Sequence, residues 1–211
     1  MPFALSHSSC ENRPMQDALP KTERLRERNR RQTLQRIAEV GIELFLAKGY
    51  DATTLDEIAA AAGISRRTFF YYFRSKDDIL LAHLAGYADA LRGTILESAS
   101  AGEPIDVMRD ALVKLSARFE SPRTIAIVRV IRETRTLHAS RQARQLQLEQ
   151  VACDALRELW PAKERRDRLR LVAMASMALM RLVVDAWIEQ DGKRPLAKDI
   201  QKAFRDLRAE I

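Results

Sequence analysis

The fold of this chain is decided by residues 53–73, which read TTLDEIAAAAGISRRTFFYYF. Thr54 followed by Glu57 fits a capping box, in which a hydroxyl and a carboxylate satisfy free backbone N–H groups at a helix start. Gly63 can take the left-handed backbone that ends a helix, and Ser65 can cap the next helix. The stretch therefore predicts two short helices joined by a tight turn, which is the layout of a helix-turn-helix for duplex DNA.

The second of these helices is predicted to have one buried and one exposed face. Phe69 and Phe73, four residues apart, are expected to pack beneath the turn together with Ile64. A helical hairpin with an ordinary solvated, charged face is the alternative. The coincidence of the caps, the turn glycine and the basic face favours a DNA-binding element. The outward face is expected to consist of Arg66, Arg67, Phe70 and Tyr71.

Residues 31–80 resemble the DNA-binding region of the tetracycline-repressor (TetR) family of bacterial transcription regulators. No single pair of matching residues is specific, but the set as a whole is. The rest of the chain matches the family only in length and helical character. The matching residues are Ile37-Ala38, Leu44-Phe45, Gly49-Tyr50, Ala52-Thr53-Thr54, Ile58-Ala59, Ala62-Gly63-Ile64-Ser65, Thr68-Phe69, Tyr71-Tyr72-Phe73 and Ser75-Lys76.

The resemblance implies which side chains contact DNA. Thr54 would bind a phosphate through its hydroxyl and its backbone N–H. Arg66 and Arg67 would enter the major groove. The other implied contacts, to phosphates or to base edges, come from Ser65, Thr68, Phe70, Tyr71, Tyr72 and Lys76.

Two positions depart from the family pattern. Arg67 stands where glycine is common, and its long side chain would bind guanine at O6 and N7. Phe70 stands where tyrosine is common, so a contact there would be apolar, to a thymine methyl group. The operators of other family members are therefore a poor guide to the DNA site of this chain.

The segment before the helix-turn-helix is strongly basic, and Arg28 and Arg31 are its candidate DNA contacts. It would lie close to phosphates and could enter a minor groove. A solubilising tail is the alternative, and binding that weakens steeply as salt rises would distinguish the two. Against only Glu23 and Glu27, the segment carries Lys21, Arg24, Arg26, Arg28, Arg30, Arg31 and Arg36.

The chain is predicted to be all-α, with an N-terminal three-helix DNA-binding domain followed by a larger helical bundle. Its 211 residues include seven glycines and seven prolines, and sustained strand alternation is absent from the sequence. The predicted divisions are a disordered basic and polar extension at 1–22, the DNA-binding domain at 23–76, and a ligand-binding and dimerisation domain at 77–211. The first helix is expected from about residue 24 to residue 48. A fourth helix, capped by Ser75, is expected to run unbroken past Leu84 and Tyr87 to Leu91.

The composition limits the partners and the compartment. A formal net charge of +7 permits nucleic-acid binding without proving it. Cys10 and Cys153 form neither a disulfide framework nor a metal-binding spacing, which suits a reducing cytoplasm. The longest apolar run, residues 171–180, stops at Arg181 and is too short to span a bilayer. We therefore expect a soluble cytoplasmic protein without a membrane partner, a metal or a cofactor.

Catalysis is not expected from this sequence. His7, His83 and His138 are scattered and have no metal-ligand neighbours. The sequence contains no nucleophile elbow, no phosphate-binding glycine loop and no zinc-binding pair of histidines on a helix.

The helix expected at about residues 166–190 is apolar over more than one face. Such a helix must be covered on both sides, by its own bundle and by a second subunit. The resemblance points the same way, because the last two long helices of family members commonly form the dimer interface. A monomer with a fully buried central helix is the alternative. The candidate interface residues are Leu179, Leu182, Val183, Trp187 and Phe204.

A ligand-responsive regulator would hold a small-molecule effector inside the bundle. Methionines suit an adaptable apolar pocket, but a stripe of them is more often plain core. Arg181 stands among apolar residues and needs a partner. Asp185, one turn away, could satisfy it locally; a ligand carboxylate or phosphate is the other possibility. The candidate lining residues are Met108, Phe119, Arg132, Met174, Met177 and Arg181.

The sequence thus predicts a homodimeric transcription regulator of the TetR type. The expected mechanism is repression at a palindromic operator in double-stranded DNA, with release by a small molecule. An activator or a ligand-independent regulator of the same fold is the first alternative. A non-specific DNA-coating protein or a helical interaction module is the remote one.

Overall fold

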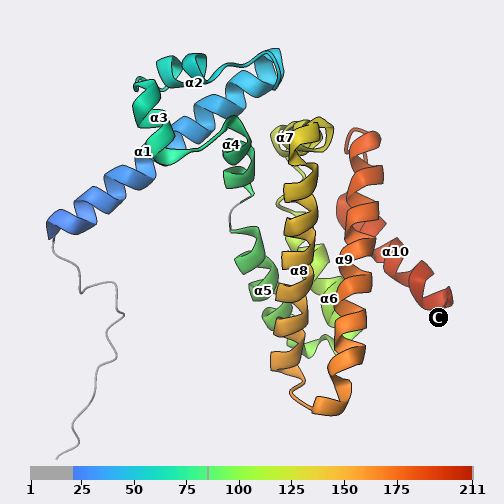
Figure 1. Ribbon diagram of the computed structural model, residues 1–211. Helices are drawn as coiled ribbons and strands as arrows, with labels where there is room; N and C mark the ends of the chain where they lie inside the picture. The colour runs from blue at the N-terminus through green and yellow to red at the C-terminus, as the bar shows by residue number, and fades with distance from the viewer. Residues whose placement is uncertain (1–20, 85, 211) are drawn as a thin grey trace, which may run out of the picture. The chain divides into compact units, whose positions relative to one another are not determined.

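The computed structural model describes residues 21–84 and 86–210, and over those residues it contains only helices and their connections (Figure 1). The all-α class is therefore confirmed. Residues 1–20, most of the expected extension, lie outside the described residues. The helices are α1 (Lys21–Lys48), α2 (Leu55–Ala61), α3 (Arg66–Tyr72), α4 (Lys76–His83), α5 (Tyr87–Glu97), α6 (Pro104–Ser116), α7 (Pro122–Glu133), α8 (His138–Leu159), α9 (Arg166–Glu189) and α10 (Leu196–Glu210), with 3₁₀ turns η2 (Ala99–Ala101), η3 (Arg135–Leu137) and η4 (Lys163–Arg165).

The start of α2 is fixed by the capping box that the sequence predicts. The Thr54 hydroxyl accepts a hydrogen bond from the backbone N–H of Glu57 at 3.2 Å. In return, the backbone N–H of Thr54 donates to the Glu57 carboxylate at 2.8 Å. The ammonium of Lys48, the last residue of α1, also pairs with this carboxylate. The cap therefore ties the end of α1 to the start of α2.

The end of α2 is a Schellman turn, and it leads directly into α3. Gly63 has a φ of +65°, a backbone conformation that costs glycine little. The N–H of Ile64 donates to the carbonyl of Ala59 at 3.0 Å, which closes the turn. Ser65 then caps α3, because its hydroxyl accepts from the backbone N–H of Thr68 at 3.0 Å. The predicted helix-turn-helix is confirmed.

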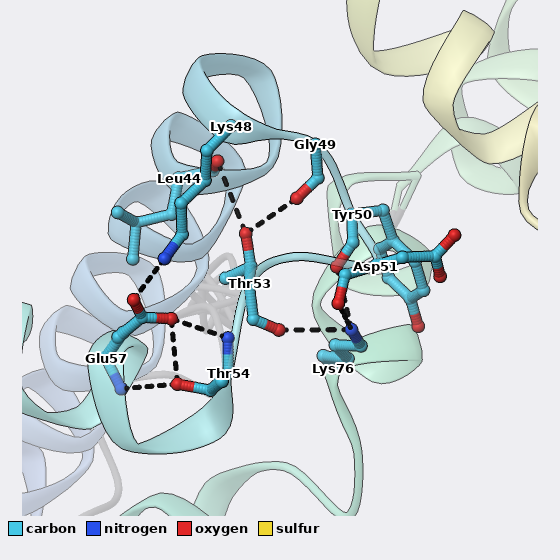
Figure 2. Close-up of polar contacts among 9 residues, drawn as sticks. All are labelled: Leu44, Lys48, Gly49, Tyr50, Asp51, Thr53, Thr54, Glu57 and Lys76. Atoms are coloured by element: carbon cyan, nitrogen blue, oxygen red, sulfur yellow. Dashed lines mark hydrogen bonds and ion pairs between the residues drawn. The ribbon is translucent and has the colours of Figure 1, made fainter.

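The connection between α1 and α2 is held from α4 by Lys76, as Figure 2 shows. The Lys76 ammonium donates to the carbonyl of Tyr50 at 2.7 Å and to that of Thr53 at 3.1 Å, with Asp51 further away at 3.4 Å. It also lies 4.3 Å from the centroid of the Tyr50 ring. The Thr53 hydroxyl closes the same turn by donating to the carbonyl of Gly49 at 2.8 Å. This turn therefore depends on one side chain from a helix more than twenty residues later.

The α4 region differs from the unbroken fourth helix that the sequence led us to expect. α4 ends at His83, and α5 begins at Tyr87. Gly86 lies between them with a φ of +78°, which an α-helix cannot contain. The apolar spacing of Leu84, Tyr87 and Leu91 continues across the break, so the pattern alone did not reveal it.

The helices α5, α6, α8, α9 and α10 pack around one apolar core. α9 packs against α6, α8 and α10, and α5 packs against α6 and α8. Two residues expected at a dimer interface belong to this core instead: Trp187 and Phe204 are each 3% exposed. The Trp187 indole N–H donates to the carbonyl of Arg194 at 2.6 Å, so its polar atom is also satisfied within the chain.

The segment Lys163–Glu189 is long and apolar enough to cross a membrane, judged by length and composition alone. The uninterrupted apolar run of residues 171–180 is shorter and lies inside this segment. A core helix of a soluble protein passes the same test, and α9 packs against three other helices of the bundle. This packing accounts for part of its apolar character, since 39% of its most apolar stretch is buried within the chain.

The capping box predicts how the stability of the N-terminal helices depends on pH. The hydrogen bond from Lys48, followed by those from Thr54, lowers the pKa of Glu57 from 4.5 to about 2. A carboxyl group whose pKa is depressed in the folded state stabilises the fold above its unfolded pKa. That contribution is lost as the pH falls towards the folded value.

We expect Glu57→Gln to lower the Tm at neutral pH, with the difference from wild type closing between about pH 5 and about pH 2. Circular dichroism melts at several pH values measure this. Glu120→Gln, which removes an exposed carboxylate with no ion pair in the described part of the chain, should leave the Tm nearly unchanged. A Glu57→Gln deficit of constant size at every pH would contradict the role of the ionised carboxylate.

Candidate nucleic-acid interface

The outer face of α3 is exposed, as the sequence predicts. Arg66 and Arg67 are both exposed, Phe70 is 47% exposed and Tyr71 is 71% exposed. Phe69, on the opposite face, is fully buried and supports the helix from beneath. A short, rigidly capped helix therefore presents two guanidinium groups and two aromatic rings to solvent. Their DNA-binding role stays a prediction.

The two arginines at the start of α3 are in different states. The Arg66 guanidinium donates to both carboxylate oxygens of Asp56, at 3.3 and 3.1 Å, and lies 5.8 Å from the ring centroid of Phe70. Arg67 makes no hydrogen bond or ion pair with the described residues. An unpaired guanidinium keeps all of its donors for an acceptor from outside the chain. Arg67 is therefore the side chain on α3 best prepared to contact a base.

Two residues that were expected to bind phosphates, Thr54 and Lys76, form hydrogen bonds within the chain instead. The Thr54 hydroxyl donates to Glu57 at 2.8 Å, and its backbone N–H is bound to the same carboxylate. Lys76 directs its ammonium at the turn carbonyls shown in Figure 2. A phosphate would have to replace one of these acceptors. Ser65 and Thr68 likewise hydrogen-bond each other, with their hydroxyl oxygens 2.8 Å apart.

The hydroxyl groups of Tyr71 and Tyr72 make no hydrogen bond within the described ranges 21–84 and 86–210. Their rings meet edge to face, with centroids 5.1 Å apart. Tyr71 is exposed and Tyr72 is half-buried. Both hydroxyls can therefore still donate to a phosphate oxygen.

The basic segment before the helix-turn-helix is part of α1. By its contacts, the chain up to Arg36 forms a unit of its own. Arg31 pairs with Glu27 at 3.0 Å, whereas Arg28 is exposed and has no ion pair among the residues that the structure describes. Because an α-helix is about 10 Å wide and the minor groove about 6 Å, this segment cannot enter a minor groove while helical. Entry of residues 21–36 into a minor groove would require them to leave the helical conformation, and their contact with DNA stays a prediction.

The structure separates the candidate pocket residues into three groups. Met108 is fully buried in the bundle core, and Met174 is 43% exposed, so neither lines a cavity described here. Phe119, Met177 and Arg181 line a cavity of about 160 Å³. Arg132 lines an adjoining cavity of about 510 Å³.

Asp185, the expected local partner of Arg181, forms an ion pair with Arg132 instead. The Asp185 carboxylate lies 3.3 Å from Nε of Arg132, and Glu189 lies 3.1 Å from another nitrogen of the same guanidinium. Arg181 makes no ion pair in the described part of the chain. The Arg181–Asp185 salt bridge that the sequence suggested is therefore not formed.

One cavity residue that the sequence analysis missed is Arg144 of α8. It lines both cavities, and its guanidinium donates to the backbone carbonyl of Leu84, directly after α4. A signal for it was present in the sequence. Arg144 precedes Leu148 and Ala152 at four-residue steps, so it lies on the stripe of α8 that turns inward.

Comparison with known proteins agrees with this geometry. Residues 37–83 match the family described as "Bacterial regulatory proteins, tetR family". The chain is 36% identical over 99 residues to the HTH-type transcriptional regulator TcmR of Streptomyces glaucescens, a match that covers 46% of this chain and 43% of TcmR. The chain thus spans less than half the length of this curated relative.

Two solved structures share the fold. One is NalD, the secondary repressor of the MexAB-OprM multidrug efflux pump in Pseudomonas aeruginosa, with a TM-score of 0.62, 19% identity, and coverage of 86% of this chain and 96% of NalD. The other is Thermus thermophilus FadR in complex with lauroyl-CoA, a TetR-family transcriptional repressor, with a TM-score of 0.55, 24% identity, and coverage of 82% of this chain and 91% of FadR. These two structures share the helical fold, and the family match covers the helix-turn-helix. Residues 37–83 therefore form a DNA-binding region of the TetR type.

The engagement of Lys76 predicts the result of removing its ammonium group. Lys76→Met should lower the stability of the N-terminal helices by about 1–3 kcal/mol, because the Thr53 carbonyl loses its donor and the Tyr50 carbonyl loses one of two. DNA affinity should fall, but its dependence on salt concentration should stay the same. Thermal melts and binding measured over a salt series test both statements, with Lys198→Met on α10 as the control.

A direct phosphate contact by Lys76 would give a different outcome. Losing one such contact should reduce the slope of log affinity against log salt by about 0.9. A reduced slope with an unchanged Tm would therefore overturn the structural role.

Proposed function

We propose that this protein is a homodimeric transcriptional repressor that binds a palindromic DNA operator and is released by a small molecule. It would act in the cytoplasm, on double-stranded DNA. The observation that carries the DNA-binding part is the exposed face of α3, where Arg67 is unpaired beside Phe70 and Tyr71. A helix of this kind, held behind a tight turn, fits the major groove.

Arg67 would supply sequence selectivity, since a free guanidinium binds guanine at O6 and N7. Tyr71 and Tyr72 would bind phosphates, and Arg28 of α1 would add a sequence-independent contact. Arg66 keeps its pairing with Asp56 in this arrangement, so its contribution is smaller. Thr54, Ser65 and Thr68 would position the helix through their caps.

The first test is selection of binding fragments from a random DNA pool. The wild type should enrich one palindromic sequence, and Arg67→Ala should lose discrimination at one base pair of each half-site by about 1–3 kcal/mol. Arg28→Ala, by contrast, should weaken binding to all sequences alike. Recovery of random sequences by the wild type would refute the proposal in favour of a DNA-coating protein.

Dimerisation is supported by an apolar stripe on α9 that this chain leaves uncovered. Leu171 and Leu182 are each 66% exposed, and Met174 is 43% exposed. At helical spacing these residues lie on one face, with Ala178 between them. Leu146 of α8, the helix that packs against α9, is also 61% exposed.

Exposed apolar side chains along one helix face are typical of a contact with another protein. A second copy of the chain would pair its own α8 and α9 with these helices, which gives the two-fold symmetry that a palindrome requires. Of the interface residues that the sequence predicts, Leu182 lies on the exposed stripe. Leu179 and Val183 are half-buried against the chain's own core and contribute less.

The dimer predicts the effect of placing a charge in this stripe. Leu182→Glu should convert the protein to a monomer, because each subunit would bring one carboxylate against the apolar surface of the other. Sedimentation velocity measures the mass, and palindrome binding should weaken in parallel. Leu25→Glu, the same substitution at an exposed leucine of α1, should leave the mass unchanged. A dimeric Leu182→Glu protein would rule out this face.

Release by a ligand is supported by the position of the cavities. Leu84, directly after α4, lines the cavities of about 160 and 510 Å³ and a third of about 350 Å³. A ligand there would contact the end of the helix that leaves the helix-turn-helix region. The neighbour FadR was solved with lauroyl-CoA, so a related fold does accommodate a small molecule. An activator would use the same coupling with the opposite effect on transcription.

A further inference from the structure

The cavities carry more positive charge than the chain neutralises. Four arginines line the larger cavity, Arg132, Arg141, Arg144 and Arg181, against the single carboxylate of Asp185 in that lining. Asp185 is paired with Arg132. Arg144 and Arg181 have no ion pair within residues 21–84 and 86–210, and they are the two arginines that also line the smaller cavity.

Arg144 is the more constrained of the two. It is half-buried, whereas Arg181 is exposed. Burial lowers the pKa of Arg144 because its charge is partly removed from water without a carboxylate to compensate. Its guanidinium is satisfied instead by a neutral acceptor, the Leu84 carbonyl. A charged acceptor would bind the same donors roughly twice as strongly.

The smaller cavity has an apolar wall beside these two guanidinium groups. Tyr87 and Phe119 meet edge to face on one side, with ring centroids 5.6 Å apart. Met177 and Met180 contribute flexible, polarisable side chains that adapt to ligand shape. Leu148 and Val184 complete the apolar lining. A ligand with an apolar body and an acidic group would match both parts of this site.

We propose that the effector is an organic acid whose acidic group binds Arg144, assisted by Arg181, and whose apolar body fills the space between Tyr87, Phe119 and Met177. This inference rests on the proposed ligand-released regulator and names the class of its ligand. On binding the acid, Arg144 gives up the Leu84 carbonyl. Leu84, directly after α4, thereby loses its hydrogen bond from α8, and the coupling between ligand and DNA follows from competition for one guanidinium.

The chemical class is tested with hexanoate, octanoate, decanoate and dodecanoate, each compared with its own amide by calorimetry on the full chain. The carboxylates should bind roughly tenfold or more tightly than the amides of equal length. Arg144→Leu should abolish this preference, and Arg144→Lys should keep part of it because the charge remains. Arg92→Gln removes a guanidinium that pairs with Glu158 outside both cavities, and it should keep the preference in full.

The coupling is tested on the DNA fragment that the wild type selects. Without any acid, Arg144→Leu should bind this fragment as weakly as the acid-saturated wild type, and adding acid should cause no further change. Arg92→Gln should bind and respond like the wild type. A folded Arg144→Leu protein with wild-type DNA affinity and wild-type response to acid would overturn the proposal.

The outcomes also separate this inference from the proposed function. If the protein selects a palindrome but no carboxylate is preferred to its amide in any pair, the organic-acid site is wrong and the regulator stands. If the protein selects no DNA sequence, the proposed function fails whatever the acid titrations show.

Discussion

The N-terminal helices depend on the turn between α1 and α2, and that turn depends on the ammonium group of Lys76. The backbone carbonyl of Thr53 accepts from Lys76, and that of Tyr50 accepts from Lys76 as well as from the Thr53 N–H, so the first turn of α4 supplies donors to this loop. Since α2 begins directly after this turn, its direction is set there. The Schellman turn at Gly63 then fixes α3 relative to α2. A half-buried cation at the start of α4 thus helps to determine where the exposed arginines of α3 are presented.

The pairing of arginines separates structural from functional positions in this chain. Arg66 and Arg132 are bound by carboxylates of the chain itself and hold elements together. Arg67 and Arg144 lack such partners among the described residues, although one is exposed and the other half-buried. An unpaired charge is inexpensive at the surface and costly inside a protein. The unpaired charge of Arg67 therefore costs little free energy, because Arg67 is exposed. The unpaired charge of Arg144 costs more, because Arg144 is half-buried, and an anionic ligand would offset that cost.

The local features of the fold could be predicted from the sequence, and the non-local ones could not. The caps at Thr54 and Ser65 and the turn at Gly63 involve residues within five positions of one another, so their spacing is visible in the chain. The contact between Arg144 and Leu84 joins positions 60 residues apart, and no local pattern encodes it. The apolar pattern of the last helices correctly predicted that they would be buried. It does not show whether an apolar residue packs in the chain's own core or against a partner. For this reason the sequence placed Trp187 at the dimer interface, whereas it lies in the core of its own chain.

The break between α4 and α5 changes how a signal could pass through the molecule. A continuous helix would carry a displacement along its own axis, because its backbone hydrogen bonds resist bending. Gly86 removes that rigidity between the two helices. A separate contact must then couple the end of α4 to the bundle, and the hydrogen bond from Arg144 to Leu84 lies at that position. Because this bond involves a cavity-lining side chain, the element that replaces the missing helical connection is also one that a ligand can reach.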